Sequence, residues 1–214
     1  MRIAAMSLDS HLTEFREIVD AIYGAYLDAC EGFARVRAHA LEVGEDVQRS
    51  YQDFQMTHPE LAHLPLADAE FTYSRWVPAN SEPRERHLHQ VPLEVLRCRN
   101  EPGGTNFQFI GNVCAVTLYQ YWEDHFRQQL AQDVGIEKND LQVPLFGELR
   151  HYRRAIIHNR GFATTEVAEC QLLKGPQLGE PIHFKRQLFE DIVDGILQVL
   201  RGLRERPEQF IRSA

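Results

Sequence analysis

A basic cluster of arginines and histidines lies between Leu149 and Gly161, in the run Leu-Arg-His-Tyr-Arg-Arg-Ala-Ile-Ile-His-Asn-Arg-Gly. Residues 150–160 of this run contain four arginines, two histidines and no acidic residue, although the whole chain has a formal net charge of −8. Guanidinium groups bind phosphate oxygens in a planar, two-pronged geometry, and imidazole exchanges protons near neutral pH. These residue types together favour an anion site, and RNA phosphate fits their chemistry.

The basic cluster is predicted to lie on a helix from about Pro144 to Asn159, ended by Gly161 in a left-handed C-cap. Apolar residues recur there at steps of four and three, at Leu145, Leu149, Tyr152 and Ile156. On an ideal helix Arg153 and His158 point about 140° apart, whereas Arg154 and His158 share a face. Arg153 falls within the apolar arc, and a lone charge there needs a partner.

The elements around this helix predict an all-α fold, an antiparallel helical bundle in a single domain spanning residues 1–214. A long N-terminal helix is expected over residues 8–50, with Gly44 as a candidate break. Its apolar positions follow a heptad seam: Leu8, Leu12, Phe15, Val19, Ile22, Tyr26, Ala29, Phe33, Val36, Ala40, Val43 and Val47. The seam packs within the bundle, or part of it meets a second copy of the chain.

Prolines interrupt residues 57–104, so this stretch is predicted to be an irregular, Pro-rich insertion. Within it, Phe71–Trp76 is expected to form a short strand and Pro92–Arg99 a short helix. The motif-bearing core helices follow over residues 105–206. They span about 106–133, 144–159 and 186–204, with a small β-hairpin before the last helix, formed by Glu169–Leu173 and Pro181–Phe184.

Bulk composition limits the class of protein. The chain has 214 residues, of which 43% are hydrophobic and 25% charged, as in ordinary globular domains. A sequence pI of about 5.7 argues against a general nucleic-acid coat. The four cysteines are scattered, and no run approaches 18 apolar residues. We therefore expect a cytoplasmic protein with no membrane association, no metal and no cofactor.

The spacing Arg153-x4-His158, followed by Asn159 and Gly161, resembles the HEPN superfamily, whose signature is an arginine four to six residues before a histidine. Three flanking segments are similar to an uncharacterised bacterial branch of it: Trp122–Arg127, Phe146–Arg150 and Ile157–Gly161. The similarity covers about residues 106–200. A second Arg-x4-His, from Arg84 to His89, stands in a Pro-broken segment and is interpreted as a chance match.

The resemblance implies a metal-independent endoribonuclease, in which a ribose 2′-hydroxyl attacks the adjacent phosphate. His158 would then act as acid or base and Arg153 would stabilise the charge of the transition state. The remaining residues of the cluster would hold the RNA backbone: Arg150, Arg154, Asn159 and Arg160. The family further implies a homodimer with a composite cleft, and a defence or toxin–antitoxin setting in which a neutralising antitoxin or regulatory partner restrains the activity.

Two other interpretations stay open. Arg154 stands where the family often has Asn, Asp or another small polar residue, which is compatible with a catalytically silent module that binds RNA, nucleotide or protein. A helical scaffold without a nucleic-acid role is the second. In that case Arg153 pairs with an acid such as Glu123 or Asp124, and His158 only balances the helix dipole.

Overall fold

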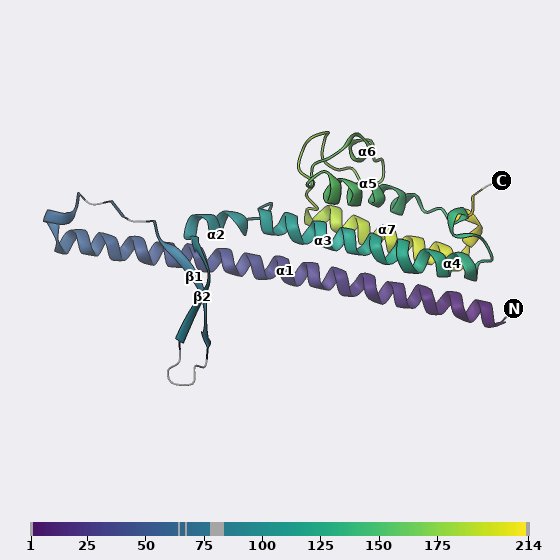
Figure 1. Ribbon diagram of the computed structural model, residues 1–214, viewed down its shortest axis with the longest axis horizontal. Coiled ribbons are helices and arrows are strands. Elements are labelled where there is room, and N and C mark those ends of the chain that lie inside the picture. The colour runs from purple at the N-terminus through teal and green to yellow at the C-terminus, as the bar shows by residue number, and fades with distance from the viewer. Residues whose placement is uncertain (1, 64, 67, 78–83, 213–214) are drawn as a thin grey trace. The chain divides into compact units, whose positions relative to one another are not determined.

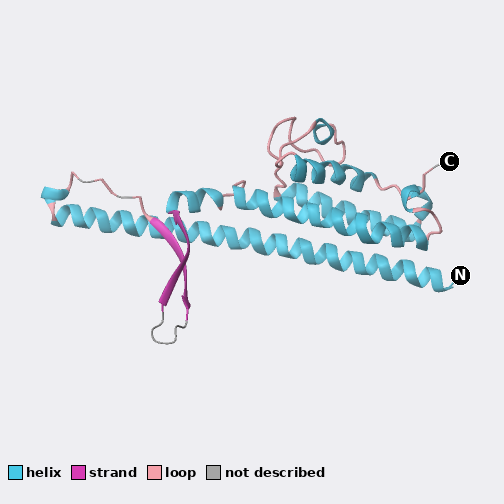
Figure 2. Cartoon of the chain, viewed as in Figure 1, coloured by secondary structure: helices cyan, strands magenta, loops and turns pink. Residues whose placement is uncertain are grey.

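The computed structural model describes residues 2–63, 65–66, 68–77 and 84–212. About 70% of the chain is helical, which confirms the prediction of a mainly helical protein. Figure 2 shows the helices in cyan. The chain divides into two compact units. We call Met1–Ala29 with Phe107–Ala214 the motif unit, and Cys30–Asn106 the hairpin unit. Across the described residues, no helix has the length and apolar character needed to cross a membrane.

Helix α1 (Arg2–Thr57) is 56 residues long and extends beyond both ends of the predicted range. Its predicted seam supplies four fully buried side chains to the motif unit: Leu12, Phe15, Val19 and Tyr26. Gly44 does not interrupt the helix. A glycine costs only about 1 kcal/mol in a helix interior, and nothing packs within 4 Å of the position that its side chain would take.

The motif unit is a bundle whose neighbouring helices run mostly antiparallel (Figure 1). Besides the first part of α1 it contains α3 (Thr105–Tyr121), α4 (Arg127–Asp133), α5 (Pro144–His158) and α7 (Arg186–Glu205). Each of these helices buries one apolar stripe, as the sequence periodicity predicts. Helix α5 carries the basic cluster.

An aromatic core fixes how α5 is rotated in the bundle. Trp122 stacks on Phe146 of α5, with ring centroids 4.1 Å apart and ring planes only 3° apart. Phe15 of α1 stacks on Phe126 at 4.6 Å. Trp122 and Phe126 are the first and last residues of a π-helical turn, which joins α3 to α4. Turns of this kind are rare and often occur near functional sites.

The prediction that residues 57–104 form an irregular insertion is wrong for the hairpin unit, which contains two paired strands. Strands β1 (Glu70–Val77) and β2 (Arg84–Pro92) form an antiparallel hairpin, followed by α2 (Leu93–Arg99). The strand predicted at Phe71–Trp76 and the short helix after it are therefore confirmed. A small core of Ala40, Val91, Leu93 and Leu96 holds the unit together. The prolines break helices but leave the paired strands intact; Pro78 and Pro83 lie outside the described residues.

The hairpin predicted before the last helix is wrong. Instead of pairing with Glu169–Leu173, the second segment meets the chain that follows α5. The N–H of Ile182 donates to the carbonyl of Gly161 at 2.7 Å, and the N–H of Ala163 donates to the carbonyl of Glu180 at 2.8 Å. The first segment has another partner, the carboxylate of Glu148 on α5.

A glycine substitution tests the packing of this region against α5. Gly175 lies against Tyr152, and a Cβ there would overlap the buried hydroxyl and lie 2.9 Å from Cζ. We expect Gly175→Ala to lower the free energy of unfolding by about 1–3 kcal/mol, the usual cost of overpacking. Denaturant unfolding measures this. Gly147→Ala is the matched control, since nothing lies within 4 Å of its Cβ position, and it should stabilise the protein by about 0.5–1 kcal/mol.

Candidate functional site

The ends of α5 set the register of its charged side chains. Pro144 occupies the first turn, where its missing N–H is no loss. At the other end the N–H groups of Asn159 and Gly161 both donate to the carbonyl of Ala155, at 2.9 and 3.2 Å. Gly161 has φ +77° and Arg160 has φ +53°. The predicted helix and its left-handed C-cap are therefore confirmed.

One face of α5 lines a cavity of about 200 Å³ in the motif unit. His151, Arg154 and His158 stand at i, i+3 and i+7, so they share this face. Short segments after the helix complete the lining with Asn159, Thr164 and Glu166. The cavity therefore brings an arginine together with two imidazoles, the groups needed for phosphate binding and proton transfer.

Arg153 is absent from this lining and occupies a different side of α5. It is half-buried, and its Nε is buried without a hydrogen-bond partner. It lies within electrostatic range of Tyr119, whose pKa is raised mainly by burial and then by Glu123, while Arg150, Arg127 and Arg153 lower it. Within one chain, the structure thus brings His158 together with Arg154 and not with Arg153, as the helical spacing predicts.

The alternative ion pairs predicted for Arg153 do not form among the described residues. Glu123 instead accepts from Arg127 at 3.0 Å and from Lys138 at 2.9 Å. Asp124 accepts a hydrogen bond from Gln120. Both acids are engaged elsewhere, so the guanidinium of Arg153 is left for another partner.

The other predicted binding residues lie in different environments. Arg150 and Arg160 are exposed, and Arg154 is exposed at the mouth of the cavity. Asn159 lines the cavity, but its Nδ2 donates to the carbonyl of Phe162 at 2.9 Å. The Asn159 amide therefore stabilises the turn after α5, which is a structural role.

Three lining residues were missed from the sequence: His151, Thr164 and Glu166. The signal for His151 was its three-residue spacing from Arg154. Glu166 belongs to the short helix α6 (Thr165–Ala168), which no motif marked. The Glu166 carboxylate accepts hydrogen bonds from the Thr164 hydroxyl and from the backbone N–H of Glu166 itself, and these bonds lower the pKa of Glu166. Arg154 and His151 make smaller contributions in the same direction. A carboxylate therefore faces the basic residues across the cavity.

Glu148 anchors the loop that follows α6. Its carboxylate accepts hydrogen bonds from three consecutive backbone N–H groups, those of Gln171, Leu172 and Leu173, at 2.7–3.0 Å. Burial, followed by the charge of Glu148, raises the pKa of the Cys170 thiol to about 12. One side chain of α5 thus holds the chain segment that follows α6.

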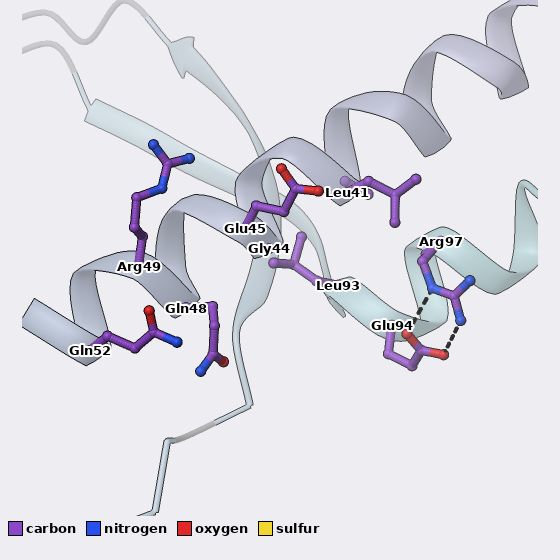
Figure 3. Close-up of a pocket in the computed structure, with 10 residues that line it drawn as sticks. Leu41, Gly44, Glu45, Gln48, Arg49, Gln52, Leu93, Glu94 and Arg97 are labelled. Atoms are coloured by element: carbon purple, nitrogen blue, oxygen red, sulfur yellow. Dashed lines mark hydrogen bonds and ion pairs between the residues drawn. The ribbon is translucent and has the colours of Figure 1, made fainter. Parts of the chain in front are cut away.

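A second cavity, of about 420 Å³, lies in the hairpin unit between α1 and α2 (Figure 3). Leu41 and Leu93 give it an apolar part. At its rim Arg97 binds Glu94 at 2.5 Å, and this bond lowers the pKa of Glu94 to about 2. The described lining contains no histidine. The second cavity is therefore a poorer candidate for acid–base chemistry than the first.

Comparison of the chain with protein-family models, with curated proteins and with solved structures gives no match. Among the described residues, no group of three or more His, Cys, Asp and Glu side chains is placed to hold a metal ion. We therefore infer function from the chemistry of the cavity residues and of Arg153.

Loss of the Glu148 anchor should loosen the loop that follows α6. In Glu148→Ala we expect the amide protons of Gln171, Leu172 and Leu173 to exchange with solvent faster, because their acceptor is gone. Hydrogen exchange followed by mass spectrometry or NMR measures this. Glu169→Ala is the control, since its exposed side chain stands in the same loop without that role. Unchanged exchange in Glu148→Ala would show that the anchor is not needed.

Replacement of Arg153 tests whether it is structural. An unpaired buried polar atom costs about 1–3 kcal/mol, and methionine keeps the apolar stem of arginine. We expect Arg153→Met to leave the free energy of unfolding unchanged or to raise it by about 1 kcal/mol. Arg127→Met is the contrast, because Arg127 binds Glu123 and the carbonyl of Leu141, and should lose about 1–3 kcal/mol. A similar loss in Arg153→Met contradicts the unpaired state.

Proposed function

We propose that the protein is a metal-independent endoribonuclease of the HEPN type, acting as a homodimer. The observation that carries the proposal is the cavity in which His158 and Arg154 meet on a helix rich in arginine. A basic site on a chain of net charge −8 favours one docking geometry over general adhesion to nucleic acid. RNA supplies both the phosphate and the 2′-hydroxyl that such a site can use.

The proposed reaction needs no cofactor. The ribose 2′-hydroxyl attacks the neighbouring phosphorus, and a 2′,3′-cyclic phosphate and a free 5′-hydroxyl are the products. His158 exchanges a proton with one of the reacting oxygens, since imidazole does so near neutral pH. Arg154 stabilises the negative charge of the phosphorane. Arg150 and Arg160, both exposed, contact the flanking RNA backbone.

A homodimer gives Arg153 a role in this scheme. Its Nε is buried without a partner, and it lies on another side of α5 from His158. If two copies of α5 meet, the Arg153 guanidinium of one copy can approach the His158 cavity of the other. The setting that we propose is cytoplasmic defence or a toxin–antitoxin pair, with a neutralising antitoxin or regulatory partner that limits cleavage of cellular or phage RNA.

A catalytically silent binding module is the second candidate. The observation in its favour is that Arg153 and His158 do not share a cavity within one chain. Such a module would bind RNA, nucleotide or a partner protein through the same basic cluster. RNA binding by the folded protein without cleavage at any pH would favour it over the enzyme, and an oligomer without RNA affinity would favour a helical scaffold.

RNA cleavage in the presence of EDTA tests the proposal. We expect the wild-type protein to cut RNA and to leave cyclic phosphate ends, because the chemistry needs no metal. His158→Ala should lose about 10²–10⁴-fold in rate, the usual contribution of acid–base catalysis, and Arg153→Ala should also lose activity. His125→Ala, an exposed histidine that is not in the cavity lining, is the control. Full activity in both folded variants contradicts the proposal.

A further inference from the structure

The cavity on α5 holds two histidines, and the proposed ribonuclease reaction as described uses only one. His151 and His158 both line it, with Arg154 between them in the sequence and on the same helix face. Seven residues separate the histidines, so their Cα atoms are about 10 Å apart along the helix. A phosphate bound to Arg154 would therefore have one imidazole on each side.

This placement fits the geometry of the reaction. The attacking and leaving oxygens lie on opposite sides of phosphorus, so the base and the acid must approach from opposite directions. Two imidazoles two helical turns apart provide such directions, whereas a single imidazole would have to serve both oxygens in turn. The arginine between them is placed for the equatorial oxygens, where the extra negative charge collects.

The surroundings distinguish the two histidines. His151 is half-buried, with its Nδ1 buried and without a partner, whereas His158 is exposed. With Nδ1 closed off, Nε2 is the nitrogen of His151 left for exchange with a ligand. Glu166 faces the cavity and interacts with His151 and Arg154. An imidazole that donates a proton starts the step with a positive charge, and Glu166 is the acidic residue in the described cavity lining.

We propose that His151 is the general acid and His158 the general base of the cleavage reaction, an inference that rests on the proposed ribonuclease function. His158 takes the proton of the 2′-hydroxyl as the new 2′-oxygen–phosphorus bond forms. His151 gives its proton to the 5′-oxygen as the phosphorus–5′-oxygen bond breaks. One proton is taken up and one is released, so the step balances without a metal or another reactant.

A substrate that needs no acid separates this role from a structural one. RNA with sulfur in place of the scissile 5′-oxygen has a leaving group that departs without a proton. We expect His151→Gln and His151→Asn to cut ordinary RNA at least 10²-fold more slowly than wild type, but to cut the sulfur substrate within about tenfold of the wild-type rate. His158→Gln should be slow on both substrates. His125→Gln is the control and should match wild type on both.

The pH profile is a second readout. Arg154 and Glu166 are the charged groups that face His151 and His158 in the cavity. Wild-type kcat/KM on ordinary RNA should fall at both low and high pH, because one histidine must be neutral and the other protonated. His151→Gln should lose the fall at high pH. If the His151 variants have equal defects on both substrates, or full activity on ordinary RNA, the role of His151 is overturned. The proposed function still stands in that case, provided that the wild-type protein cuts RNA. A wild-type protein that cuts neither substrate would overturn both.

Discussion

The stacking of Phe146 on Trp122 is the contact on which the candidate site depends. Successive residues of a helix turn by about 100°, so one fixed side chain determines the direction of all the others. Arg153 follows Phe146 by seven residues, nearly two full turns, and is therefore held on the same side, near Tyr119 and with its Nε buried. Arg154 is the next residue and lies about 100° further around the helix axis, which places it in the cavity lining.

Sequence periodicity was sufficient to predict α5, its left-handed end and the separation of Arg153 from His158. Each of these follows from local geometry, and His151 could have been found by the same spacing rule. Glu166 could not be predicted in this way, because it enters the cavity from a separate segment of the chain. The position of that segment depends on hydrogen bonds between residues 161–163 and 179–182, and no pattern in either stretch specifies its partner.

The misplaced hairpin has the same cause. Alternating apolar residues predict that a segment is extended, but the partner that takes its backbone N–H groups decides whether it becomes a strand. The N–H groups of residues 171–173 bind the single carboxylate of Glu148 on α5, so they are not available to a neighbouring strand. In residues 57–104 the prolines predict irregular structure, but Pro92 only ends the strand β2.

Arg153 and Arg154 are adjacent in sequence, but the structure gives them different chemistry. Arg154 meets both histidines of the cavity in one chain, so the proposed proton transfers and phosphate binding would not require a second copy. Arg153 keeps a buried Nε without a partner, a cost that an added acceptor from another chain or from RNA phosphate would remove. In the proposed enzyme, assembly and chemistry would thus fall to neighbouring residues of one helix: dimer formation would affect the site through Arg153, while the proton transfers would stay within each chain.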